Sequence, residues 1–240
     1  MIPQLGSASI ITTCKDAAGI AGNVFAFGLF VSPIPTFRRI MRNQSTEQFS
    51  GLPYIYALLN CLITMWYGTP LVSSNNTLVL SVNFAGALFQ LVYIALYIFY
   101  ADKNVKVRIG GLFLADLCVF GIVVGGSLQI GDLSLRRTVV GVLSCVALIS
   151  MFASPLFIIN LVIRTKSVEF MPFYLSLSTF LMSASFFIYG LLNEDPFVCI
   201  PNGLGSLLGL TQLVLYFHFK RKGMEVLREE SLIESYERAV

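Results

Sequence analysis

The chain alternates between long apolar stretches and short polar connections. Seven of the apolar stretches are long enough for a helix to cross a bilayer, which takes about 17–25 residues. They cover residues 17–38, 53–70, 78–100, 110–128, 138–163, 171–191 and 200–219. Apolar runs of this length are typical of membrane-spanning helices rather than of a soluble core. The pattern predicts an all-α membrane protein with seven transmembrane helices.

Short motifs from the first part of the chain return in the same order in the second part. The pairs are Phe30–Pro33 with Phe152–Pro155, Asn43–Glu47 with Thr165–Glu169, Trp66–Gly68 with Ile188–Gly190, and Val82–Gly86 with Pro201–Gly205. The first three pairs lie 122 residues apart and the last pair 119, so the copies differ by a short insertion or deletion. A duplicated apolar unit predicts two similar helix bundles. Transporters built in this way bind their substrate between the two bundles.

The composition points to the same class. Hydrophobic residues make up 56% of the chain and charged residues 12%, and the mean hydropathy is +0.78, which excludes an ordinary soluble domain. Five cysteines are scattered without a metal-binding or disulfide spacing, so we interpret them as small packing residues. The net charge of +3 comes from loop residues and requires no nucleic-acid partner.

Lysine and arginine are divided unequally between the two sets of loops. If the N-terminus lies outside, the cytosolic side carries Arg38, Arg39, Arg42, Lys103, Lys106, Arg108, Arg164, Lys166, Lys220, Arg221, Lys222, Arg228 and Arg238. The other side keeps Lys15, Arg136 and Arg137. Because basic residues accumulate on the cytosolic side of membrane proteins, the division predicts an outside N-terminus and a cytosolic C-terminus.

Both repeats carry a basic loop after their first span, so both have the same orientation. Three crossings end on the side opposite to their start, and an extra span, residues 110–128, must therefore reset the chain. We predict two parallel three-helix repeats joined by a linker helix, a 3+1+3 architecture. The predicted parts are an extracellular or lumenal N-terminus (1–16), a first repeat (17–100), a linker helix with flanking loops (101–137), a second repeat (138–219) and a cytosolic regulatory or trafficking tail (220–240).

Several motifs, in order, resemble those of the plant SWEET sugar transporters, a family that is itself an example of parallel repeats. They are Ser32–Phe37, Ser45–Tyr54, Leu59–Cys61 and Trp66–Gly68 in the first repeat, and Ala153–Leu156, Thr165–Phe173 and Ile200–Gly203 in the second. The resemblance runs from Ala18 to Phe219. It implies facilitated, bidirectional sugar movement by alternating access, with no enzymatic chemistry, no cofactor and no metal.

Two asparagines at matching repeat positions are the main candidates for sugar binding. Asn83 and Asn202 open the third span of their repeats, and a carboxamide both donates and accepts hydrogen bonds, as a sugar hydroxyl requires. A carboxamide within an apolar span either bonds to a neighbouring helix or faces a polar cavity. Repeat symmetry predicts that the two residues face each other, and the SWEET family carries its sugar-binding asparagines at these positions.

The resemblance adds Phe186 and Thr64 to the binding site. The family has an aromatic residue, often tryptophan, at the first position and a small polar residue at the second. Phe186 keeps an apolar plate for the C–H face of a sugar but lacks an indole N–H, and packing alone would also explain an aromatic residue there. We expect its bulk to favour a hexose over a disaccharide.

Four prolines form a second group. Pro33 and Pro155 lie within the first spans of the repeats, and Pro53 and Pro172 lie at the starts of the second spans. Proline removes a backbone hydrogen bond, so a helix can bend at that point. In the family these positions form the inner gate, and the resemblance therefore implies a gating role.

The resemblance also places Tyr67 and Asp195 in an outer gate. Coupling to protons or sodium normally needs carboxylates or histidine along the path, and the interiors of the two repeats carry almost none. Asp116 is acidic and lies within a span, but it belongs to the linker helix, where we expect it to pair with a neighbour or face a subunit contact. Passive uniport is therefore predicted.

Other membrane-protein classes fit less well. A seven-helix receptor has no internal repeat, and a retinal protein needs a lysine in its last span. Lysosomal amino-acid exporters share the architecture but carry Pro-Gln where this chain has Pro33-Ile34 and Pro155-Leu156. We expect sugar and membrane lipid as partners, and assembly into a homo-oligomer with hetero-oligomers of related transporters as an alternative. We also expect a multi-pass location in the membrane, with the plasma membrane favoured and the vacuolar membrane as an alternative.

Overall fold

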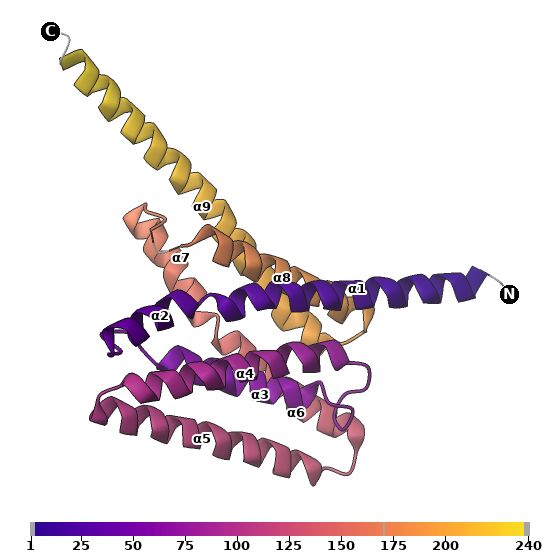
Figure 1. Cartoon of the computed structure of the whole chain (residues 1–240). Coiled ribbons are helices and arrows are strands. Elements are labelled where there is room, and N and C mark those ends of the chain that lie inside the picture. The colour runs from indigo at the N-terminus through magenta and orange to yellow at the C-terminus, as the bar shows by residue number, and fades with distance from the viewer. Residues whose placement is uncertain (1–2, 170, 238–240) are drawn as a thin grey trace.

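The computed structural model describes residues 3–169 and 171–237, with side chains for residues 9–169 and 171–221. Every regular element in these ranges is a helix (Figure 1). The helices are α1 (Pro3–Val31), α2 (Ile34–Asn43), α3 (Leu52–Tyr67), α4 (Thr77–Tyr100), α5 (Lys103–Leu128), α6 (Leu133–Ser150), α7 (Ala153–Thr165), α8 (Phe173–Leu192) and α9 (Pro196–Glu237).

These helices make seven crossings, as predicted, because two of the crossings are bent. Helices α1 and α2 form one apolar unit, Ser9–Asn43, and α6 and α7 form another, Leu133–Thr165. Pro33 interrupts the first because it has no N–H for the Leu29 carbonyl, which accepts from the Ser32 amide at 3.3 Å instead. The second bends three residues before Pro155, the residue equivalent to Pro33, and there the Phe152 amide donates to the Ile149 carbonyl at 3.0 Å.

The outermost helices are longer than the apolar pattern predicts. Helix α1 begins at Pro3 rather than at residue 17, and α9 continues to Glu237 rather than ending at residue 219. The α9 extension is rich in residues that favour helices, such as Glu, Arg and Leu, and helix propensity does not require an apolar face. The α1 extension, which contains Pro, Gly, Ser and Thr, has no such preference. The side chains of the predicted tail beyond Arg221, Arg228 among them, and the whole of Arg238 lie outside the described residues.

The two repeats interlock rather than standing apart. Helix α1 packs against α4 of its own repeat and against α8 of the other, while α6 packs against α9 of its own repeat and against α3 of the other. This reciprocal exchange is the result expected from two similar bundles related by a rotation. Helix α5 lies along the edge of the molecule against α3, as a linker outside both repeats (Figure 1).

Two glycines show how closely the repeats correspond. A Cβ atom on Gly68 would lie 2.7 Å from the backbone nitrogen of Leu80, and one on Gly190 would lie 2.6 Å from that of Cys199. Only glycine therefore lets the second and third spans of each repeat approach to this distance. Four of the five described non-glycine residues with left-handed φ are also paired, Gln44 (φ 50°) with Lys166 (φ 52°) and Asn75 (φ 67°) with Glu194 (φ 50°), while Glu47 (φ 48°) has no such partner.

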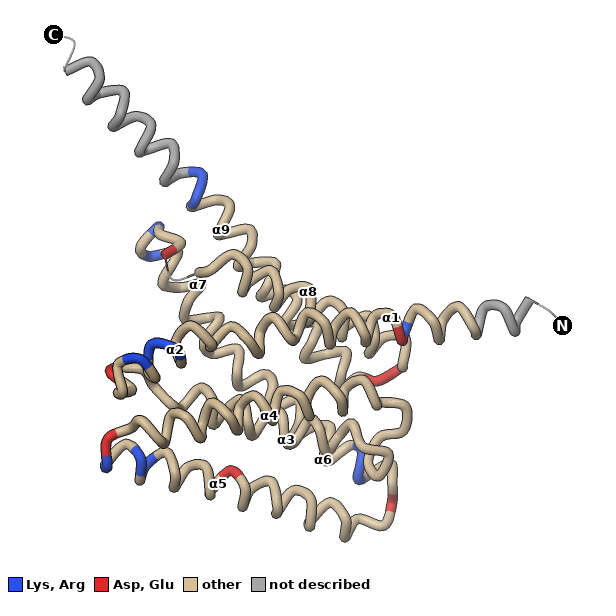
Figure 2. Tube along the Cα trace, viewed as in Figure 1, with Lys and Arg blue, Asp and Glu red and all other residues tan. Residues whose placement is uncertain are grey.

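Charged residues gather at the two ends of the bundle, with a wide apolar band between them and one acidic position midway along α5 (Figure 2). At the end near α2, Arg39 pairs with Glu47 at 2.6 Å. Hydrogen bonds from Arg39 and Asn43 lower the pKa of the Glu47 carboxyl below its usual value. Large exposed apolar side chains such as Phe99 and Ile122 cover the sides of the bundle, as a lipid-facing surface requires.

Candidate functional site

A cavity of about 240 Å³ lies between the two repeats. Its described lining comes from α1, α3 and α4 of the first repeat, from α6, α8 and α9 of the second, and from Met151 at the bend between α6 and α7. Thr64, Asn83, Phe186 and Asn202 all line it. The structure thus brings the four predicted binding residues together in one space, while their role in binding stays a prediction.

Asn83 and Asn202 have the same local geometry in their two helices. Asn83 Nδ2 donates to the Val79 carbonyl at 2.9 Å, and Asn202 Nδ2 donates to the Val198 carbonyl at 2.8 Å. Each bond holds the side chain against the preceding turn of its own helix. Among the described residues no hydrogen bond reaches either Oδ1, so each carboxamide keeps an acceptor and a second N–H for a ligand.

Thr64 and Phe186 complete the wall in different ways. Thr64 Oγ1 lies 2.9 Å from Ser144 Oγ, a hydrogen bond that joins α3 of the first repeat to α6 of the second. Phe186 is 5% exposed and stands edge-on to the ring of Tyr189, with ring centroids 6.2 Å apart. The site therefore combines polar groups with an aromatic ring in one cavity, as a sugar with hydroxyls and apolar C–H faces requires.

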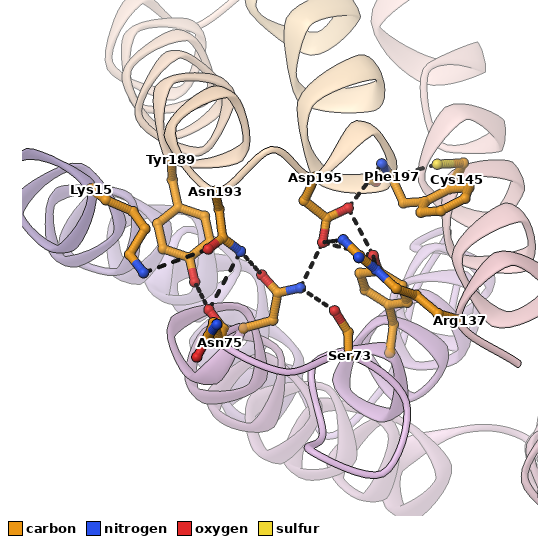
Figure 3. Close-up of polar contacts among 11 residues, drawn as sticks. Lys15, Ser73, Asn75, Arg137, Cys145, Tyr189, Asn193, Asp195 and Phe197 are labelled. Carbon is orange, nitrogen blue, oxygen red and sulfur yellow. Dashed lines mark hydrogen bonds and ion pairs between the residues drawn. The ribbon is translucent and has the colours of Figure 1, made fainter. Parts of the chain in front are cut away.

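The predicted outer-gate residues meet above this cavity. The Tyr67 hydroxyl lies 2.7 Å from both carboxylate oxygens of Asp195 and donates to them. Asn76 Nδ2 donates to the same carboxylate at 2.6 Å, and Arg137 forms an ion pair with it at 3.1 Å. Figure 3 shows Asp195 between Arg137 of α6 and the loop that carries Ser73. The carboxylate thereby ties α9 to α3, to α6 and to the start of α4.

A second set of contacts extends this closure toward α1. The Tyr189 hydroxyl donates to the Asn75 carbonyl at 2.7 Å, and Asn193 Nδ2 donates to Asn76 Oδ1 at 2.9 Å. Lys15 of α1 reaches Asn193 Oδ1 at 3.5 Å (Figure 3). Hydrogen bonds between the two repeats therefore connect the bundle along this whole end.

Sequence reasoning missed several members of this network. From the sequence, Arg137 was counted only among the basic residues of the outer side, and Asn76 was not singled out. The place of Asn76 in the network could have been predicted, because Asn76 and Asp195 are separated by the 119 residues of the repeat. The two residues therefore occupy equivalent places at the symmetry axis, where they meet. Ser144 of the cavity wall gave no signal in the sequence.

The four prolines lie away from the cavity, toward the opposite end of the helices. Pro33 separates α1 from α2, and Pro155 lies in the first turn of α7, just after the second bend. Pro53 occupies the first turn of α3, and Pro172 directly precedes α8. Two of the prolines thus mark bent crossings and two mark helix starts, an arrangement that leaves their gating role a prediction.

Comparison with known proteins places this geometry in context. A family model described as "Sugar efflux transporter for intercellular exchange" matches residues 16–105 and 138–223. The chain is 64% identical over 226 residues to bidirectional sugar transporter SWEET2 of Arabidopsis thaliana, covering 94% of this chain and 96% of that protein. It is 60% identical over 212 residues to bidirectional sugar transporter SWEET2a of Sorghum bicolor, covering 88% and 87%.

A solved structure has the same fold. The chain matches the 3.7 Å structure of a eukaryotic SWEET transporter with a TM-score of 0.87 at 54% sequence identity. The match covers 88% of this chain and 99% of that one. Both the whole-chain identity and the superposition therefore extend over the two repeats and the linker.

Proposed function

The chain belongs to the SWEET family of sugar transporters, and from this premise we propose that it is a facilitative, bidirectional uniporter that holds one sugar between Asn83 and Asn202. It is a multi-pass membrane protein and not an enzyme. In this mechanism a sugar moves down its own gradient by alternating access, binding from one side of the membrane and leaving on the other.

One observation carries the proposal: two carboxamides from equivalent repeat positions line a single cavity with the same hydrogen-bond arrangement. If the residues served only to join helices, their side chains would be expected to bond across helix boundaries. Both instead bond within their own helix and keep an acceptor and a donor for the cavity. A sugar hydroxyl, which also donates and accepts, fits that pair.

Two further features support passive transport of a small sugar. None of the described residues that line the cavity is Asp, Glu, His, Lys or Arg, so the cavity itself offers no carrier for a coupled proton. The cavity volume of about 240 Å³ lies below the range of about 300–1,000 Å³ for pockets that hold drug-sized ligands. A hexose is therefore favoured over a disaccharide.

The gates follow from the two ends of the helices. The hydrogen bonds of Tyr67 and Asp195 hold the outer end closed, and the substrate would then exchange at the opposite end, near Pro33, Pro53, Pro155 and Pro172. Bending at these prolines would close that end while the outer network separates. Alternating access requires this exchange, because both gates must not open together.

The orientation in the membrane and the oligomeric state are inferred from the distribution of charge and from the exposed surface. The excess of basic residues near α2 and in the loops at that end of the bundle favours a cytosolic position for this end, with the N-terminus outside. The plasma membrane is favoured over the vacuolar membrane. The exposed apolar face of α5, with Leu114 and Ile122, favours a homo-oligomer or a hetero-oligomer with related transporters.

The proposal is tested by flux of radiolabelled D-glucose in cells that lack hexose transport, measured as uptake and as efflux. Asn83→Ala and Asn202→Ala should each reduce both directions, since each removes one side of the binding pair. Gln212→Met is the matched control, because Gln212 is also buried in α9 but does not line the cavity. Unchanged flux in both asparagine variants would refute the site, and loss of flux on collapse of the proton gradient would refute passive uniport.

A further inference from the structure

Gln90 is a buried amide whose oxygen has no partner. Its side chain is on α4, is 8% exposed and lines the cavity. Gln90 Oε1 is fully buried and accepts no hydrogen bond from any described residue. The same is true of Asn60 Oδ1 on α3, which lines the same cavity. Two unpartnered acceptors in one apolar cavity need a donor that the described protein residues do not supply.

These two oxygens lie deeper than the pair of asparagines. Helices α3 and α4 are antiparallel, and Gly86 approaches Cys61 while Gly68 approaches Leu80. This register puts Thr64 level with Asn83. Asn60 then lies one turn further toward the α2 end of the bundle. Gln90 lies seven residues beyond Asn83, about 10 Å along the helix.

The deeper acceptors belong to one repeat only. The residue that corresponds to Asn60 in the second repeat is Met182, which also lines the cavity, and the residue that corresponds to Gln90 is Gly209. Symmetry of the fold therefore does not require amides here. An unpartnered buried oxygen destabilises the folded protein by about 1–3 kcal/mol, so a residue that is kept at this cost has a use in a functional state.

We propose that Gln90, together with Asn60, forms an inner acceptor site that receives hydroxyl hydrogens of the sugar on the α2 side of the asparagine pair. The inference deepens the proposed function and rests on it. Asn83 and Asn202 hold the sugar at the symmetric centre, and the inner site adds acceptors on the α2 side of a cavity whose wall also includes the apolar side chains of Met182 and Phe186. A hydroxylated ligand is thereby oriented and is drawn toward the end where it leaves.

The test uses purified full-length protein, D-glucose and its five monodeoxy derivatives. Gln90→Met and Asn60→Leu remove the acceptors while keeping side-chain length, and Gln212→Met is again the matched control. Each cavity variant should weaken D-glucose binding by about 3- to 10-fold, the value of one hydrogen bond, while its melting temperature stays equal or rises. A purely structural role would lower the melting temperature instead.

The deoxy sugars identify the bond. One derivative should bind the parent protein more weakly than D-glucose does but bind Gln90→Met as tightly as D-glucose binds that variant. If Gln90→Met and Asn60→Leu bind D-glucose like the parent, or keep the parent's ranking of all five derivatives, the acceptors hold only water and the inference is wrong. That result leaves the proposed function standing if Asn83→Ala and Asn202→Ala still weaken binding. A parent protein that binds no D-glucose would overturn both.

Discussion

Replacing Arg137 by glutamine removes a cation that reaches the buried carboxylate of Asp195. The guanidinium lies 3.1 Å from Asp195 Oδ2, and the two side chains are 39% and 0% exposed. Two unit charges 4 Å apart near a protein surface attract each other by about 4 kcal/mol. Because water screens the half-exposed guanidinium and glutamine can still donate a hydrogen bond, we expect a net loss of about 1–2 kcal/mol.

That loss acts on the equilibrium between a closed and an open outer gate. In the proposed gating mechanism, the ion pair joins α6 to Asp195, directly before α9, only while the outer gate is closed, so its energy is lost on opening. A change of about 1.4 kcal/mol shifts an equilibrium tenfold. Arg137→Gln should therefore raise the fraction of molecules with an open outer gate by about tenfold.

Cys61 provides the assay, because it lines the cavity below the gate and is 6% exposed. A membrane-impermeant maleimide added outside intact cells reaches this thiol only through an open gate, and mass spectrometry of the labelled peptide measures its rate. Arg136→Gln is the matched control, since Arg136 donates only to the carbonyls of Ile130 and Leu71. Equal labelling rates in Arg137→Gln, Arg136→Gln and the parent would refute the reasoning.

Three more substitutions test other parts of the structure. A Cβ on Gly22 would lie 2.7 Å from the Phe186 ring, so Gly22→Ala should lower the free energy of unfolding by about 1–3 kcal/mol and raise the half-saturation concentration for sugar. Gly28→Ala is the control, because its Cβ would meet a side-chain oxygen at 3.3 Å and should change both quantities much less. One carboxylate oxygen of Asp116 is buried and has no hydrogen-bond partner among the described residues. Asp116→Leu should therefore increase the free energy of unfolding by about 1–3 kcal/mol, measured as a higher melting temperature, and leave the pH dependence of flux unchanged. Pro33→Ala restores a backbone donor at the bend, so it should raise the melting temperature while slowing flux in both directions; faster flux would contradict the hinge.

The sequence was sufficient to predict the fold and to predict residues that line one common cavity. Apolar length predicts the crossings, and the repeat offset predicts that Asn83 and Asn202 occupy equivalent places. Both predictions depend on periodic features that a sequence displays directly. The register of individual residues, such as Thr64 level with Asn83, follows only once glycines such as Gly68 are seen to set the helix spacing.

The outer network was harder to predict, for a physical reason. The contact of Arg137 with Asp195 joins residues from two helices through a side chain long enough to point in several directions. Charge patterns record how many basic residues lie on each side of a membrane, not which carboxylate each one reaches. The bend at Phe152 was also missed, because it precedes Pro155 by three residues and the proline alone would place it later.

Equilibrium binding of D-glucose to the purified protein tests the central claim most directly, because it separates binding from gating. With Asn83→Ala or Asn202→Ala, the dissociation constant should rise by about tenfold for each lost carboxamide, with the melting temperature of the ligand-free protein held close to that of the parent. Glucose bound equally tightly by the parent and by both variants would contradict a site made by the two asparagines.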